Sequence, residues 1–229
     1  MASWGKMRIS LRLKFCYHYL RQKLDFAALL TLQKQEASHQ SHVLTGEFCN
    51  TFLKYALTDK MTCIHQSKGS EMEPTISARD KLLVRKLPYL NAKLTLTPQQ
   101  IRVGDVVLLK DPLGSNNYVV RRLAAVSGYE MASNNKEDKP FVLEDGQCWV
   151  LSDNKNLKPG KNNDSRTYGP ISITDIVGRV IYRYQARGNH GFVRNSEIST
   201  RSDLSVIFIE LDFSEVIHHR DDGSSTSQT

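Results

Sequence analysis

The feature that most limits the fold is a series of short, β-rich segments separated by turn residues, which begins near residue 67. The segments are rich in Val, Ile, Leu, Tyr and Phe, as is typical of strands. Predicted strands cover residues 80–87, 105–110, 117–126, 140–144, 147–152 and 175–184. Turn sequences such as Asp145-Gly146 and Gly169-Pro170 lie between them. Many short strands with few helices predict a mainly β fold, an antiparallel domain of the Greek-key or barrel-like type.

This pattern divides the chain into three segments. Residues 1–64 are predicted to form a basic, helical N-terminal extension, with a second helix near 47–55. Residues 65–185 are predicted to form the β domain. Residues 186–229 are predicted to form a linker, a short apolar element at 203–217 and a disordered tail. The apolar element fits a strand or a helix equally well, because its continuous apolar core has no readable period.

The first 24 residues are basic and contain no acidic residue before Asp25. Apolar residues recur there at helical spacing, namely Ile9, Leu13, Tyr17, Leu20 and Leu24. A basic helix with one apolar face is typical of an organelle targeting segment, mitochondrial or plastid, or of a helix that lies on an anionic membrane. A helix packed on its own domain is the remaining alternative. No apolar run reaches the length of about 18 residues that a membrane span needs, so no transmembrane helix is predicted.

Composition disfavours several classes of function. The net charge of +7 is spread along the chain without a block of Lys and Arg, so nucleic-acid binding is not expected. The cysteines form no CxxC pair and no ligand set with histidine; they are Cys16, Cys49, Cys63 and Cys148. Free thiols are therefore expected, and neither a metal site nor a cofactor is predicted.

Four segments carry the functional signal, because they occur in a specific order and spacing. They are GSEMEPTI (69–76), VGDVVLLKDP (103–112), VVRRLAAVSGYE (119–130), and LEDGQCWVLSDN followed by NDSRTYGPISITDIVGRV (within 143–180). Together they resemble the conserved boxes of type I signal peptidases, and most closely those of the mitochondrial inner membrane protease subunits. The resemblance covers residues 67–183, and it implies the β-rich catalytic fold of that family.

The same resemblance identifies the positions where this family does its chemistry. Its members cut targeting peptides with a serine nucleophile and a neutral lysine that accepts the hydroxyl proton. In this chain the serine position falls on Glu71 and the lysine position falls on Arg121. A guanidinium stays protonated in proteins, because its pKa lies above about 12, so Arg121 is not expected to act as a base. A serine that orients the lysine in the family corresponds to Asn162. No catalytic residue is therefore expected.

Glu71 and Arg121 carry opposite charges at positions that the family places within hydrogen-bonding reach. We therefore expect an ion pair in place of the dyad, which makes the former active site a structural clamp. Ser70 is the alternative nucleophile, although a shift of one residue in an extended segment turns a side chain to the opposite face. Attack by the Glu71 carboxylate on an amide is disfavoured, because it forms a high-energy mixed anhydride.

Two further groups of residues follow from the resemblance. A shallow apolar groove for an extended peptide, which binds by strand addition even without chemistry, is expected at Met72, Ile76, Val119 and Val120. Hydrogen bonding that holds loops in place is expected at Asp153, Asn154, Asp164, Ser165 and Arg166.

The sequence thus predicts a non-catalytic member of this family, a peptide-binding or complex-assembly subunit associated with the mitochondrial inner membrane. One alternative is an active serine endopeptidase that processes targeting or signal peptides, alone or within an inner membrane peptidase complex. Another is a basic β domain that binds nucleic acid or lipid. The predicted partners are a subunit of such a complex or another protein, an extended peptide, and the membrane surface through peripheral contact.

Overall fold

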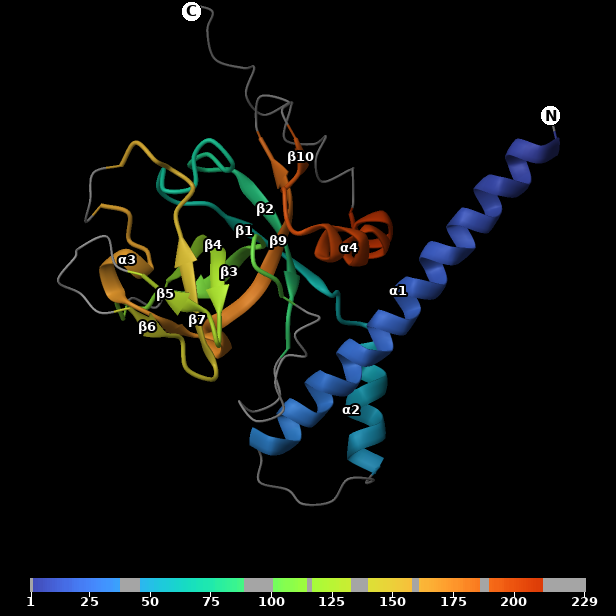
Figure 1. The fold of residues 1–229 in the computed structure, drawn as a ribbon. Helices are drawn as coiled ribbons and strands as arrows, with labels where there is room; N and C mark the ends of the chain where they lie inside the picture. Colours follow the sequence, from blue (N-terminus) through green and yellow to red (C-terminus); the bar gives the residue numbers. More distant parts are fainter. Residues whose placement is uncertain are drawn as a thin grey trace, which may run out of the picture.

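The protein is described by a computed structural model that covers residues 2–37, 46–88, 101–114, 117–132, 140–157, 161–185 and 190–211. Its centre is a curled antiparallel sheet that forms a half-barrel, with long helices packed to one side (Figure 1). The predicted fold class, a mainly β antiparallel domain with an N-terminal helical extension, is therefore confirmed. The predicted C-terminal tail lies outside the described residues beyond position 211.

The main sheet has the strand order β1-β2-β9-β3-β4-β7-β8, and β10 pairs with β9. Its strands are β1 (Thr62–Gln66), β2 (Lys81–Lys86), β3 (Val106–Lys110), β4 (Tyr118–Val126), β7 (Gln147–Leu151), β8 (Ile171–Ser172), β9 (Ile176–Tyr184) and β10 (Gly191–Phe192). A second sheet pairs β5 (Glu130–Met131) with β6 (Phe141–Val142). The predicted strands correspond to β2, β3, β4, β6, β7 and β9. The other four strands were not predicted from the sequence, because three of them span only two residues and β1 contains polar residues.

Strand β9 organises the sheet, because both of its edges are paired. One edge pairs with β2, and the other pairs first with β3 and then with β10. Gly178 lies where β9 closely approaches β2, since a Cβ atom at this position would lie 2.5 Å from the carbonyl oxygen of Arg85. A residue without a side chain is therefore needed for the two strands to pair.

The three long helices lie towards the ends of the described chain, and one short helix lies between β7 and β8. They are α1 (Ala2–Ala37), α2 (Gly46–Leu57), the short α3 (Ser165–Tyr168) and α4 (Glu197–Glu210), with a 3-10 turn at Ile173–Asp175. Helix α4 packs between α1 and β9 (Figure 1). Val206 and Ile207 of α4 share a buried apolar cluster with Phe26 of α1 and Ile181 of β9. This packing shows that the apolar element near the C-terminus is a helix where it is described.

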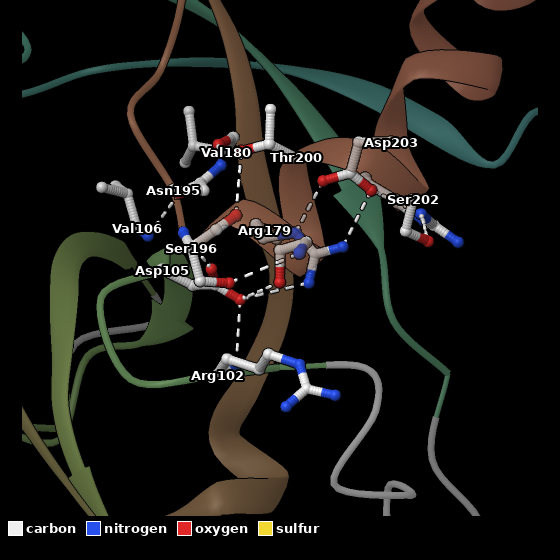
Figure 2. Close-up of polar contacts among 12 residues, drawn as sticks. Arg102, Asp105, Val106, Arg179, Val180, Asn195, Ser196, Thr200, Ser202 and Asp203 are labelled. Carbon is white, nitrogen blue, oxygen red and sulfur yellow. Dashed lines mark hydrogen bonds and ion pairs between the residues drawn. The ribbon is translucent and has the colours of Figure 1, made fainter.

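A buried ion network attaches α4 to the sheet (Figure 2). Arg179 of β9 donates hydrogen bonds of 2.8 Å from Nε and from Nη2 to the carboxylate of Asp203 in α4. The Nη1 atom of Arg179 also lies 3.3 Å from Asp105, which precedes β3. Asp105 in turn accepts a hydrogen bond of 3.0 Å from the backbone N–H of Ser196, the N-cap of α4. The helix is thereby fixed to two of the sequence boxes, VGDV and VGRV.

Candidate functional site

Glu71 lies in a tight loop between β1 and β2. The loop is closed by its own backbone, with a hydrogen bond of 3.2 Å from the Glu73 N–H to the Ser70 carbonyl and one of 2.9 Å from the Ile76 N–H to the Met72 carbonyl. Gly69 has a positive φ of 76°, and a Cβ atom there would collide with the Glu71 carboxylate. The Glu71 side chain therefore folds back over Gly69, in a conformation that glycine permits.

Arg121 lies in the middle of β4, where its backbone pairs with Val107 of β3. Its side chain is only 3% exposed, and two of its nitrogens donate to backbone carbonyls. The Nε atom donates to Asn163 at 2.9 Å, and Nη1 donates to Val120 at 2.5 Å. Burial lowers the pKa of Arg121 below its ordinary value, and the negative charge of Glu71 acts against that shift. The guanidinium is thus held in place by groups that accept hydrogen bonds.

The Nη2 atom of Arg121 lies 3.7 Å from Oε1 of Glu71. This separation is an ion-pair distance, longer than a hydrogen bond, and Nη2 has no hydrogen-bond partner among the described residues. The Glu71 side chain is 23% exposed, so one member of the pair is buried and the other reaches the surface. The structure therefore brings together Glu71 and Arg121, the two charged residues predicted to lie at the dyad positions.

A pocket of about 170 Å³ opens over this pair, and its lining residues include His65, Lys68, Glu71, Val119, Val120 and Arg121. Strands β1 and β4 are not neighbours in the sheet, but both contribute to the lining because the sheet curls. Burial and the positive charge of Lys68 lower the pKa of His65, so its ring is neutral near pH 7. The pocket thus combines apolar side chains with charges of both signs.

The four residues predicted to form a peptide groove are split by the structure. Val119 and Val120 line the pocket beside Arg121. Met72 and Ile76 are instead buried in an apolar cluster with strand residues such as Val84. Both side chains turn inward from the loop and hold it to the core. Val120 belongs to the same buried cluster and is only 5% exposed, so Val119 is the one of the four whose side chain is both partly exposed and at the pocket.

Asp153 joins the Glu71 loop to β4. It receives hydrogen bonds of 2.8 and 2.6 Å from Arg122 and one of 2.5 Å from the hydroxyl of Thr75. Burial opposes ionisation of Asp153, but the hydrogen bonds from Arg122 and Thr75 outweigh it and hold the pKa below its ordinary value. Neighbouring Asn154 donates 2.8 Å from Nδ2 to the Ser70 carbonyl. These contacts fix the position of the loop that carries Glu71.

Asp164 and its neighbours hold the other side of the site. Asp164 caps α3 and accepts from the Ser152 N–H at 2.9 Å and from Arg166 Nη2 at 2.6 Å. Burial opposes its ionisation, yet the hydrogen bonds from Arg166 and Ser152 hold its pKa below the ordinary value. The hydroxyl of Ser165 accepts 3.0 Å from the Val150 N–H. Asn163 directly precedes Asp164 in the same loop, and its carbonyl accepts the hydrogen bond from Arg121 Nε.

Two candidate residues lie apart from the pair. Ser70 precedes Glu71 but is not among the residues that line the pocket, and its carbonyl is held by Asn154. Asn162, at the position of the orienting serine, is buried, and its Oδ1 has no hydrogen-bond partner in the described part of the chain. No cluster of His, Cys, Asp and Glu suited to a metal ion occurs among the described residues.

Sequence reasoning missed the residues that position the pair. Arg122 and Thr75 were recognised only as members of the boxes VVRRLAAVSGYE and GSEMEPTI. One pattern in the sequence could have indicated this contact. An arginine lies in an apolar strand and an aspartate lies in a later box, and a half-buried charge needs a partner. The sequence alone did not indicate which of the aspartates supplies it.

Comparison with known proteins identifies relatives for most of the chain. Residues 55–139 match the family model described as signal peptidase, peptidase S26. The chain is 42% identical over 202 residues to the mitochondrial ATP-independent inner membrane protease subunit 2 of Arabidopsis thaliana, a match that covers 87% of this chain and 94% of that protein. It is 28% identical to mitochondrial inner membrane protease subunit 1 of Mus musculus, covering 56% and 72% of the two chains. Subunit 2 of Saccharomyces cerevisiae is 26% identical, with 55% and 69% covered.

These names place the relatives at the mitochondrial inner membrane, which confirms the location predicted from the sequence. Among the described residues, no helix has both the length and the apolar character that a membrane crossing requires.

Proposed function

Because the chain belongs to the mitochondrial inner membrane protease subunits of the signal peptidase family, we propose that it is a member without catalytic activity. In this proposal it binds an extended peptide or assembles with a partner subunit. The observation that supports it is the charge pair at the dyad positions, with Arg121 Nη2 at 3.7 Å from Glu71 Oε1.

The chemistry of the family cannot proceed through these two side chains. Peptide cleavage begins when a neutral amine removes the proton of a hydroxyl nucleophile. Arg121 keeps its proton near neutral pH and already donates to the carbonyls of Asn163 and Val120. Glu71 offers a carboxylate, whose attack on an amide carbon leads to an unstable anhydride. The site therefore lacks both halves of the first proton transfer.

Ser70 does not restore the reaction. Its carbonyl is tied to Asn154 at 2.8 Å, and the pocket that Arg121 faces is lined by other residues of the loop. Lys68 is an exposed side chain that lines the pocket, whereas Ser70 is not among the lining residues. The serine hydroxyl and an amine are thus not presented together to a substrate.

The pocket supports a binding role. Val119 supplies partly exposed apolar surface, and the outer edge of β1 is unpaired within the described sheet. An extended peptide that hydrogen-bonds to a sheet edge gains affinity from its main chain and specificity from pockets for alternate side chains. The names of the relatives, which are subunits, support assembly with a second protein as the accompanying role.

Binding and cleavage can be read from one mixture. The purified full chain is titrated into a fluorescent peptide that contains the processing segment of a mitochondrial targeting sequence. Anisotropy reports binding, and mass spectrometry of the same sample reports cleavage. We expect a saturable rise in anisotropy with the peptide intact. Val119→Asp places a charge in the pocket and should weaken binding at least tenfold, because an unpaired charge is costly to bury (about 1.4 kcal/mol per factor of ten). Leu113→Asp, at an exposed site, is the matched control.

A further inference from the structure

Helix α1 carries apolar side chains on two different faces. One face packs on the protein: Phe26 and Ala27 are buried, and Phe15 stacks on Phe208 of α4 with ring centroids 5.2 Å apart. The other face holds Leu13, Tyr17, Leu20 and Leu24, which follow one another at intervals of four, three and four positions. Residues at such spacing form a single stripe along a helix. This second face is called the α1 stripe below.

The first face makes α1 part of the folded protein. The hydroxyl of Tyr19 donates 2.7 Å to Glu210 at the end of α4, and Gln22 Nε2 donates 3.1 Å to the Ser202 carbonyl. Glu210 also accepts hydrogen bonds from the backbone N–H groups of Met61 and Thr62 at the start of β1. The orientation of α1 relative to the sheet is therefore fixed through α4.

The α1 stripe is exposed over its whole length. Its four side chains are between 42% and 64% exposed, with Leu24 the lowest and Leu13 the highest. Figure 1 shows that the N-terminal part of α1 projects past α4, away from the sheet. Large apolar side chains gathered on one exposed face mark a surface that another protein or a membrane covers.

The charges beside the stripe indicate whether a protein or a membrane covers it. Arg12, Lys14 and Arg21 are exposed on the same stretch of helix, and the sequence holds no acidic residue before Asp25. A second copy of the chain packed stripe to stripe would bring these like charges together, which disfavours that occupant. Anionic lipid headgroups instead complement the charges while acyl chains cover the stripe.

We propose that α1 lies in the interface of an anionic lipid membrane, with the α1 stripe against the acyl chains and its basic residues among the headgroups. The stripe extends over about 17 Å at 1.5 Å per residue, which is short for the hydrocarbon core of about 30 Å and suits a helix parallel to the surface. Since α1 is locked to α4 and the sheet, binding in this way also sets the orientation of the β domain on the membrane. The inference concerns membrane attachment and stands whether or not the chain cleaves peptides.

The test is co-flotation of the full chain with lipid vesicles. Two vesicle types are compared, phosphatidylcholine alone and phosphatidylcholine mixed with phosphatidylglycerol. We expect binding to the anionic vesicles that weakens with added salt. The double variant Leu13→Gln/Leu20→Gln should bind at least about tenfold more weakly, because it removes apolar area from the stripe. Arg12→Gln and Lys14→Gln each remove one positive charge, and each should weaken binding to anionic vesicles about fivefold.

Leu113→Gln/Val142→Gln is the matched control, since it removes exposed apolar side chains from loops and strands of the β domain. Equal binding by the control and the stripe variant would overturn the proposal. So would a dimer in the absence of vesicles that the stripe variant converts to a monomer, because a second copy would then cover the stripe. A mature protein that mass spectrometry shows to lack residues 1–24 would overturn it as well. Circular dichroism of the stripe variant checks that its fold is retained.

Discussion

Arg179 and Asp203 are joined by two hydrogen bonds of 2.8 Å, with each side chain about 2% exposed. Arg179 belongs to the last sequence box of the β domain, whereas Asp203 belongs to α4 near the end of the described chain. The pair therefore makes α4 an integral part of the fold. Burial lowers the pKa of Arg179, but the hydrogen bonds and charge of Asp203 outweigh it and raise that pKa above its ordinary value.

Replacement of Asp203 should be strongly destabilising. Asp203→Ala leaves the Arg179 guanidinium buried without its main partner, a change that costs about 3–5 kcal/mol of unfolding free energy. Urea unfolding followed by circular dichroism measures this cost. Glu197→Ala is the control on the same helix, because the Glu197–Arg201 pair is exposed and is worth about 0.3–0.5 kcal/mol. Similar costs for the two variants would contradict the assignment of Asp203 as the anchor of α4.

Gly178 should tolerate no side chain. In Gly178→Ala the new methyl group meets the Arg85 carbonyl, so β2 and β9 must separate, at a cost of about 1–3 kcal/mol. Gly191→Ala in β10 is the matched control, because a Cβ there has no heavy atom within 4 Å. The thermal midpoints of the two variants provide the measurement. An unchanged midpoint for Gly178→Ala would show that the strands are less closely paired than described.

The contribution of Asp153 should depend on pH in a defined direction. Its pKa in the folded protein is below the ordinary value of 3.8, so its stabilisation is fully present above 3.8 and is lost as the pH falls through the folded pKa. Asp153→Asn should therefore lower stability by about 1–3 kcal/mol at neutral pH. The difference from the unsubstituted protein should shrink only below pH 3.8. Urea midpoints across a pH series measure it, and a difference that grows on acidification is the contrary result.

Glu71 and Arg121 should stabilise the fold as a pair. The substitutions Glu71→Gln and Arg121→Met remove the charges with little change in volume. We expect each to destabilise the protein and the double variant to cost less than their sum, with a coupling of roughly 0.5–3 kcal/mol. The coupling should lie near the low end of that range, because Glu71 is 23% exposed. Strictly additive costs would show that the two side chains act independently.

Much of the β domain could be predicted from the sequence. The apolar runs with turn residues between them placed β2, β3, β4, β7 and β9, since such runs reflect burial on a pleated surface. The resemblance of the boxes to the signal peptidase family predicted that Glu71 and Arg121 are close together, and their side chains lie 3.7 Å apart. Both predictions depend on local pattern and order along the chain.

The rest depends on packing that no local pattern encodes. The apolar element near the C-terminus forms helix α4, in which Val206 and Ile207 pack with Phe26, a residue distant in sequence. The sequence predicts a single apolar face for α1, the one that contains the α1 stripe. The other apolar face was not predicted, because its residues have their partners in α4, which is distant in sequence. Met72 and Ile76 were assigned to a groove, but their loop has no period that distinguishes inward from outward side chains.

Peptide cleavage tests the central claim, the absence of catalysis at the Glu71–Arg121 site, most directly. The purified full chain and its Ser70→Ala variant are incubated with a reporter that carries the processing segment of a targeting peptide, and products are followed by mass spectrometry. We predict that neither protein yields cleavage above the level of the peptide alone. Cleavage by the unsubstituted chain that is lost in Ser70→Ala would contradict the claim and establish an active serine peptidase.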